Sequence, residues 1–158
     1  NPVDPGEAGE VTITTLGVTG MPLVRFKTGD VVYHYDEPCR CGRNTVRVSS
    51  VVGRKKQMIK FKGTTLYPPA LFDILDNIPD VKNYVVEVFT NELGTDDVLV
   101  RVGTLTPGER FEKEIKDIFR AKVRVAPGVI FDTPENVSKI MFPPMSRKPV
   151  KFIDKRSH

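Results

Sequence analysis

The chain has 158 residues, of which 39% are hydrophobic and 28% are charged, and its formal net charge at pH 7 is +4. This length suits one ordinary domain or two small ones, and this composition excludes a disordered chain. The sequence holds no run of about 18 apolar residues, which excludes a transmembrane helix. The chain opens with Asn1 rather than Met, so we expect it to continue a longer polypeptide.

The first part of the chain carries β-type sequence patterns and no helical pattern. Residues 10–16 alternate and are rich in β-branched side chains, which predicts a strand. Short extended runs separated by turn-forming residues follow, and we expect strands at residues 22–26, 30–35 and 45–52. Residues 1–54 are therefore predicted to form a small all-β subdomain.

From Lys55 onward, strand patterns alternate with amphipathic helices. Gly63 favours a hairpin, a helix is expected from Pro68 until just before Pro79, and a second helix follows the capping sequence at residues 106–109. Further strands are expected at residues 85–89, 97–102, 123–131 and 150–154. We therefore predict that residues 55–158 form a compact α+β domain, with a mixed sheet and both helices on one of its faces.

Two segments carry chemistry that suits a nucleotide. The run Met21-Pro22-Leu23-Val24-Arg25-Phe26-Lys27-Thr28-Gly29-Asp30 ends in an aspartate on a glycine turn, and Gly53-Arg54-Lys55-Lys56 places an arginine before a basic strand. A carboxylate can accept hydrogen bonds from both vicinal hydroxyls of a ribose, and a guanidinium can donate to ribose or phosphate oxygens. With their spacing, the two segments resemble the adenylate-forming acyl-CoA ligases, and most closely the C-terminal portion of the phenylacetate–CoA ligase family.

The resemblance implies roles for three of these residues. The residue that matches Asp30 holds the ribose hydroxyls of ATP and of the acyl-adenylate, and the residue that matches Arg54 reaches the same nucleotide. The position of Lys56 is the hinge about which a mobile C-terminal lid domain turns between an adenylation pose and a thioester-forming pose. The change of sequence pattern near Lys56 supports a domain boundary there without the analogy.

Two further residues take roles from the family. Lys148, in the register Lys148-Pro149-Val150-Lys151-Phe152-Ile153-Asp154, would neutralise charge on the α-phosphate during adenylation. Arg147 stands where glycine is usual before this lysine. Gly63 would line the path of the acyl-adenylate and of coenzyme A, although Thr64 and Thr65 depart from the family pattern and a plain hairpin turn explains the glycine equally well.

Cys39 and Cys41 are separated by one residue, a spacing that strains a disulfide, and nothing else indicates an oxidising compartment, so we expect the cytoplasm. Similar ligases often carry this Cys-x-Cys-Gly turn, so the resemblance suggests a structural Zn²⁺ held by Cys39, Cys41 and ligands from elsewhere. Structural zinc takes four ligands, so two reduced cysteines in a turn are the alternative interpretation.

The parent reaction implied by the resemblance joins a small carboxylic acid to coenzyme A, with ATP and Mg²⁺, through an acyl-adenylate. The sequence lacks the phosphate-binding loop and the acid pocket of such an enzyme, so we expect a C-terminal fragment that needs an N-terminal adenylation domain and is inactive alone. We expect neither nucleic acid nor a membrane as partner, and the oligomeric state stays open. One alternative is a stand-alone basic binding module that uses the strand at residues 55–62, and another is an adenylating enzyme with a different acyl acceptor.

Overall fold

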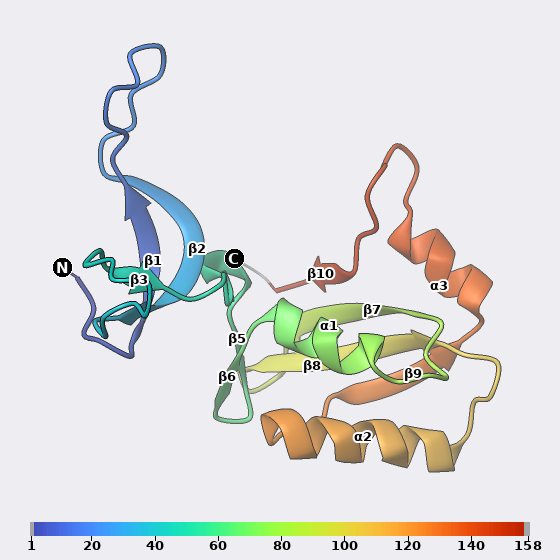
Figure 1. Ribbon diagram of the computed structural model, residues 1–158. Coiled ribbons are helices and arrows are strands. Elements are labelled where there is room, and N and C mark those ends of the chain that lie inside the picture. The colour runs from blue at the N-terminus through green and yellow to red at the C-terminus, as the bar shows by residue number, and fades with distance from the viewer. Residues whose placement is uncertain (1, 157–158) are drawn as a thin grey trace. The chain divides into compact units, whose positions relative to one another are not determined.

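The computed structural model describes residues 2–156, which divide into two compact units with the boundary between Met58 and Ile59 (Figure 1). The boundary predicted from the sequence lies a few residues earlier, between Arg54 and Lys55.

The first unit is built on a small antiparallel sheet. Its central strand, β2 (Phe26–Tyr35), pairs with three others: β1 (Ala8–Ile13), β3 (Arg47–Val48) and β4 (Gly53–Arg54). A 3-10 helix, η1 (Lys55–Gln57), follows β4 directly. Within residues 2–58 the structure describes no α-helix, in agreement with the predicted all-β character.

The long strand β2 differs from the predicted pattern. The sequence predicts two strands, at residues 22–26 and 30–35, with a turn between them. The structure instead has one continuous strand that contains a bulge, because Gly29 has a φ of +80° and the pairing with β1 shifts between Glu10 and Thr12. Residues 14–25, which include the first half of the first motif, form an irregular hairpin that projects beyond the sheet (Figure 1).

The second unit contains a hairpin and a four-stranded mixed sheet. The hairpin joins β5 (Ile59–Phe61) to β6 (Thr64–Leu66). In the sheet, the strand order is β10-β7-β8-β9, in which β7 and β8 are antiparallel and both edge strands run parallel to their neighbours. The strands are β7 (Asn83–Thr90), β8 (Asp96–Gly103), β9 (Gly128–Asp132) and β10 (Phe152–Asp154).

Two helices cover one face of this sheet. In α1 (Pro68–Asp76) and α2 (Glu109–Val123), apolar side chains recur at helical spacing and pack against the inward residues of β7 and β8. The largest fully buried side chains of this core include Phe61, Leu71 and Phe119. The predicted α+β fold class, with a mixed sheet and two helices on one face, is confirmed.

A third helix, α3 (Pro134–Met141), was not predicted. Its residues Val137 and Met141 are buried against Val85, which points to the opposite side of β7 from the main core. Thr133 caps this helix by accepting a hydrogen bond of 3.3 Å from the backbone N–H of Asn136. Among residues 2–156, no helix has both the length and the apolar character needed to cross a bilayer.

Candidate nucleotide-binding site

Asp30 and Arg54 face one another across two paired strands of the first unit. They are direct register partners in the antiparallel pairing of β2 with β4, and Asp30 Oδ1 lies 3.4 Å from Arg54 Nε. Their side chains are 31% and 68% exposed, respectively. The pairing therefore presents a carboxylate and a guanidinium side by side, and both can be reached from solvent.

The backbone before Asp30 is held in a fixed conformation. The Asp30 N–H donates to the hydroxyl of Thr28 over 3.1 Å, and that hydroxyl donates to the carbonyl of Val11 over 3.2 Å. Gly29, between them, has the positive φ that glycine adopts readily. The Thr-Gly-Asp sequence thus forms a bulge that fixes the start of the Asp30 side chain relative to both neighbouring strands.

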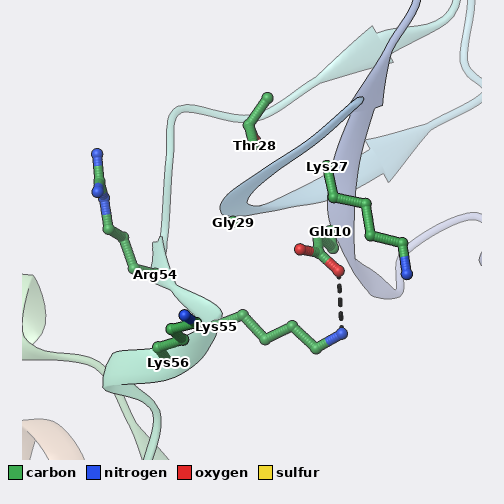
Figure 2. Close-up of a pocket in the computed structure, with 7 residues that line it drawn as sticks. All are labelled: Glu10, Lys27, Thr28, Gly29, Arg54, Lys55 and Lys56. Carbon is green, nitrogen blue, oxygen red and sulfur yellow. Dashed lines mark hydrogen bonds and ion pairs between the residues drawn. The ribbon is translucent and has the colours of Figure 1, made fainter. Parts of the chain in front are cut away.

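An open pocket of about 560 Å³ lies beside this pair, within the first unit. It is lined by one acidic residue, four basic residues and the Thr-Gly bulge, namely Glu10, Lys27, Thr28, Gly29, Arg54, Lys55 and Lys56 (Figure 2). The Lys55 ammonium lies 2.9 Å from the Glu10 carboxylate, whereas the Arg54 side chain extends in a different direction (Figure 2).

The charge balance of the pocket favours an anionic ligand. Its lining carries an excess of cationic groups over the single carboxylate of Glu10, which Lys55 already neutralises. A phosphate could be bound by charge-assisted hydrogen bonds from the guanidinium and ammonium groups, while the Asp30 carboxylate next to Arg54 accepts hydrogen bonds from hydroxyls. The arrangement thus offers the acceptors and donors that a nucleoside phosphate needs.

Comparison with known proteins places the chain in a family context. No protein-family model matches the chain. Over 106 residues, covering 67% of this chain, it is 33% identical to a phenylacetate–coenzyme A ligase of Thermus thermophilus. This chain is related to the C-terminal portion of the phenylacetate–CoA ligase family. The resemblance predicted from the sequence is thereby confirmed.

A second curated relative agrees with this relationship, and a solved structure shows the same fold. A phenylacetate–coenzyme A ligase of Aromatoleum evansii is 29% identical over 84 residues, 52% of this chain. A crystal structure of 2-hydroxyisobutyryl-CoA ligase, in the postadenylation state with 2-HIB-AMP, matches 97% of this chain and 33% of its own, with a TM-score of 0.73 and 21% identity. At this identity the structure supports the fold. The matched segments span only 24% and 18% of the lengths of the two curated relatives.

The predicted hinge and the predicted loop glycine lie close to the boundary between the units. Lys56 is an exposed residue of η1, two residues before that boundary. Gly63 follows Lys62 in the tip of the β5–β6 hairpin, and both have positive φ, +79° and +48°. No atom lies within 4 Å of a Cβ built on Gly63, so its backbone conformation alone accounts for the glycine. The roles inferred from the phenylacetate–CoA ligase family stay predictions for both residues.

Lys148, the predicted catalytic residue, belongs to the second unit. It lies in the loop between α3 and β10 and is exposed, as the proline-rich sequence predicts. The Ser146 hydroxyl donates a hydrogen bond of 2.7 Å to the Lys148 carbonyl, which shapes the loop backbone. The structure therefore brings together Asp30 and Arg54, and it places Lys148 and Gly63 in the other unit.

The predicted zinc ligands lie in the turn between β2 and β3. The Cys41 thiol is 2.9 Å from the Cys39 sulfur, and hydrogen bonds from Cys41 lower the pKa of Cys39 below its ordinary value. Nearby His34 pairs instead with Asp36, over 2.9 Å. Within residues 2–156, no group of three His, Cys, Asp or Glu side chains could hold a metal ion. Two thiols alone do not make a structural zinc site, so a zinc ion here would need ligands from outside residues 2–156 and stays a prediction.

Sequence reasoning did not identify Glu10 as part of the site. Glu10 appears in the sequence only as a polar residue in a strand, and its approach to Lys55 depends on how β1 is registered against β2. No local sequence signal marks it: only the structure shows that its side chain is largely buried, which is unusual for a glutamate unless it is paired.

Proposed function

We propose that this chain is the C-terminal portion of an ATP-dependent ligase that joins an aryl or acyl carboxylic acid to coenzyme A in the cytoplasm. The observation that carries this proposal is the Asp30–Arg54 pair beside a cationic pocket. The sequence relationship to two phenylacetate–coenzyme A ligases supports the reaction type and suggests phenylacetate or a similar aryl acid as substrate.

In the adenylation step, the substrate carboxylate attacks the α-phosphorus of ATP, and pyrophosphate leaves. Asp30 would accept hydrogen bonds from the two ribose hydroxyls and so fix the position of the nucleotide. Arg54, held beside it by strand pairing, would donate to a ribose or phosphate oxygen with a guanidinium that is charged at every physiological pH.

Lys148 would act on the charge that develops in the same step. Its side chain is carried on an exposed loop, where a ligand can reach the ammonium group. A cation at the α-phosphate stabilises the pentavalent transition state, and removal of one such interaction typically lowers the rate by about 10²–10³-fold.

In the second step, the thiol of coenzyme A attacks the acyl-adenylate carbonyl, and AMP leaves. A rotation about Lys56 would exchange the residues that face the adenylate between the two steps. Lys56 suits a hinge because it is an exposed residue of a short 3-10 turn at the end of the first unit, just before the boundary with the second. The Gly63 hairpin would then approach the adenylate from the second unit.

The proposed ligase also needs residues that this chain does not provide. The segments matched in the curated relatives make up about a quarter of their length or less. We propose that the acid pocket and the phosphate loop come from an N-terminal adenylation domain, and that the 158-residue chain alone catalyses neither step.

A chimeric enzyme tests this proposal. This chain would replace the corresponding C-terminal part of the Thermus thermophilus relative, and pyrophosphate release would be measured with ATP, coenzyme A and phenylacetate. We expect turnover by the chimera and none by the 158-residue chain alone. Asp30→Asn should lower kcat/KM of the chimera by about 10–100-fold, because hydrogen bonds from the ribose hydroxyls to a charged carboxylate are lost. Asp36→Asn, the same change at an exposed carboxylate away from the Asp30–Arg54 pair, serves as the matched control.

Direct binding separates the ligase from a general basic module. We expect the isolated chain to bind AMP weakly, and Asp30→Asn to weaken that binding while Asp36→Asn does not. Titration with a single-stranded oligonucleotide should show no binding beyond that of AMP. Tighter oligonucleotide binding that falls steeply with salt would contradict the proposal and favour a nucleic-acid module.

A further inference from the structure

The cysteine turn brings two thiols into contact at the surface. Cys41 Sγ donates a hydrogen bond to Cys39 Sγ over 2.9 Å, and Cys41 is exposed while Cys39 is half-buried. These are the two cysteines of the chain. A peroxide or a soluble thiol can therefore reach the pair directly from solvent.

The turn is held closed independently of the sulfurs. The Arg47 side chain donates to the carbonyl of Glu37 over 3.0 Å, which joins the two ends of the connection between β2 and β3. The Gly42 N–H donates to the Cys39 carbonyl over 2.9 Å, and Gly42 has a φ of +81°. The sulfur contact therefore belongs to an ordered turn.

We propose that Cys39 and Cys41 form a reversible dithiol–disulfide site that peroxides oxidise. A disulfide has a sulfur–sulfur distance of about 2.05 Å, so the two atoms need to approach by only about 0.9 Å. Both residues lie in the turn, so this movement requires no shift of β2 or β3. The proposal is independent of the ligase function.

The geometry also assigns the order of the two sulfurs. Because Cys41 donates its hydrogen bond to Cys39, negative charge is better stabilised on the Cys39 sulfur than on the Cys41 sulfur. The Cys39 thiolate attacks one peroxide oxygen, the O–O bond breaks, and the departing oxygen takes up a proton and leaves as water, which gives a sulfenic acid at Cys39.

Cys41 completes the reaction as the resolving residue. Its sulfur attacks the sulfur of Cys39, the S–O bond breaks, and a second water leaves with the Cys41 proton. The two thiols together lose two electrons and two protons, and one hydrogen peroxide is reduced to two waters. One intervening residue strains the ring that this disulfide closes, so small thiols reduce it readily. The strain expected from the sequence thus opposes a permanent disulfide and favours a reversible one.

Thiol titration and mass spectrometry of the whole chain test this site. After treatment with hydrogen peroxide, we expect both free thiols to disappear, the monomer to lose two hydrogens in mass, and dithiothreitol to restore both. In Cys41→Ser, a sulfenic acid should accumulate at Cys39 and be trapped by dimedone. In Cys39→Ser, the remaining Cys41 thiol should react with peroxide at least about tenfold more slowly than the Cys39 thiol does in Cys41→Ser.

Three results would overturn the proposal. One is sulfinic acid or a disulfide between chains, in place of the internal disulfide. Another is equal peroxide reactivity of the two single variants. The third is retention of both thiols at peroxide doses that fully oxidise glutathione. Because each cysteine is replaced singly by an isosteric serine in an exposed turn, loss of folding would not obscure the readout.

Discussion

The ammonium group of Lys151 lies 3.1 Å from the carboxylate of Asp76, which ties the segment before β10 to the end of α1. The Tyr84 hydroxyl, on β7, accepts a hydrogen bond from Lys151 and donates one of 2.9 Å to Asp76. Burial, followed by the interaction with Asp76, raises the pKa of Tyr84 far above its ordinary value, so the hydroxyl stays protonated. Three separate elements thus meet at one polar cluster at the edge of the core.

We predict that Tyr84→Phe destabilises the second unit. The ring is 2% exposed and its packing is retained, but the Asp76 and Lys151 groups lose their shared partner. The free energy of unfolding should fall by about 1 kcal/mol. Urea denaturation followed by far-ultraviolet circular dichroism measures it. Tyr33→Phe, on an exposed strand position, is the control and should change the value by less than about 0.5 kcal/mol.

Glu87 gives the second unit a pH-dependent stability. Its carboxylate is almost fully buried on β7, between Lys155 and Arg101, and Asp132 lies on the far side of Arg101. Burial alone would raise the pKa of Glu87, but the hydrogen bonds and charges of Lys155 and then Arg101 outweigh it and hold the pKa below its usual value. A carboxyl whose folded pKa is depressed stabilises the fold above its unfolded pKa, about 4.3, and this stability is lost as the pH falls through the lower, folded value.

The matching experiment compares Glu87→Gln with the parent chain across pH. At pH 7 the variant should be less stable by about 1–3 kcal/mol, because Lys155 and Arg101 lose a buried acceptor charge. This difference in stability should shrink below about pH 4.3. There the Glu87 carboxyl of the parent chain takes up a proton when the chain unfolds, which lowers the stability of the parent toward that of the variant. Denaturation midpoints at pH 7 and at several acidic values measure this. A difference that stays constant with pH would show that packing, and not charge, causes the loss.

The sequence predicts best the elements whose apolar residues repeat over several turns. In α2, the residues Phe111, Ile115 and Phe119 mark one face, and the structure buries all three. The helix α3 escaped prediction because it has only 8 residues, of which Val137 and Met141 are buried, so its apolar pattern does not repeat over several turns. At Gly29 the local pattern predicts a turn between two strands and misses the bulge, because it cannot show that β1 continues to pair on both sides of it.

The same limit applies to the site. Asp30 and Arg54 could be selected from local motifs and from the family resemblance, and strand pairing places them side by side. The partner of Lys55 could not be foreseen, because Glu10 lies 45 residues away in the sequence and reaches it only through the sheet. Local sequence therefore indicates the functional groups, whereas the contacts between distant residues follow from the tertiary structure.

Gly63 gives a test of backbone conformation without a packing effect. A Cβ at this position would meet no atom, but φ of +79° is strained for any residue other than glycine, so Gly63→Ala should cost about 1 kcal/mol of stability. Lys62→Asn, at the neighbouring position with φ of +48°, should stay within about 0.5 kcal/mol of the parent, because asparagine tolerates this region. Equal losses in both variants, measured by urea denaturation, would contradict the turn-based explanation.

The first unit is predicted to open more readily than the second when the 158-residue chain is studied alone. Within residues 2–58, the buried hydrophobic side chains that the structure describes are Val31 and Val32, whereas Leu16 is 89% exposed. The second unit buries a large apolar cluster across α1, α2 and its sheet. Because local stability follows buried apolar contacts, amides in β2 should exchange with solvent faster than those in β7.

Hydrogen exchange followed by mass spectrometry measures this difference on peptides from each strand. We expect peptides of β2 to exchange at least about tenfold faster than peptides of β7 in the isolated chain. In the chimera with the Thermus thermophilus adenylation part, protection of β2 should rise while that of β7 stays unchanged, if the added part covers the exposed apolar residues. Equal protection of the two strands in the isolated chain would mean that the first unit needs no covering partner, and would weaken the case for an adenylation domain packed on it.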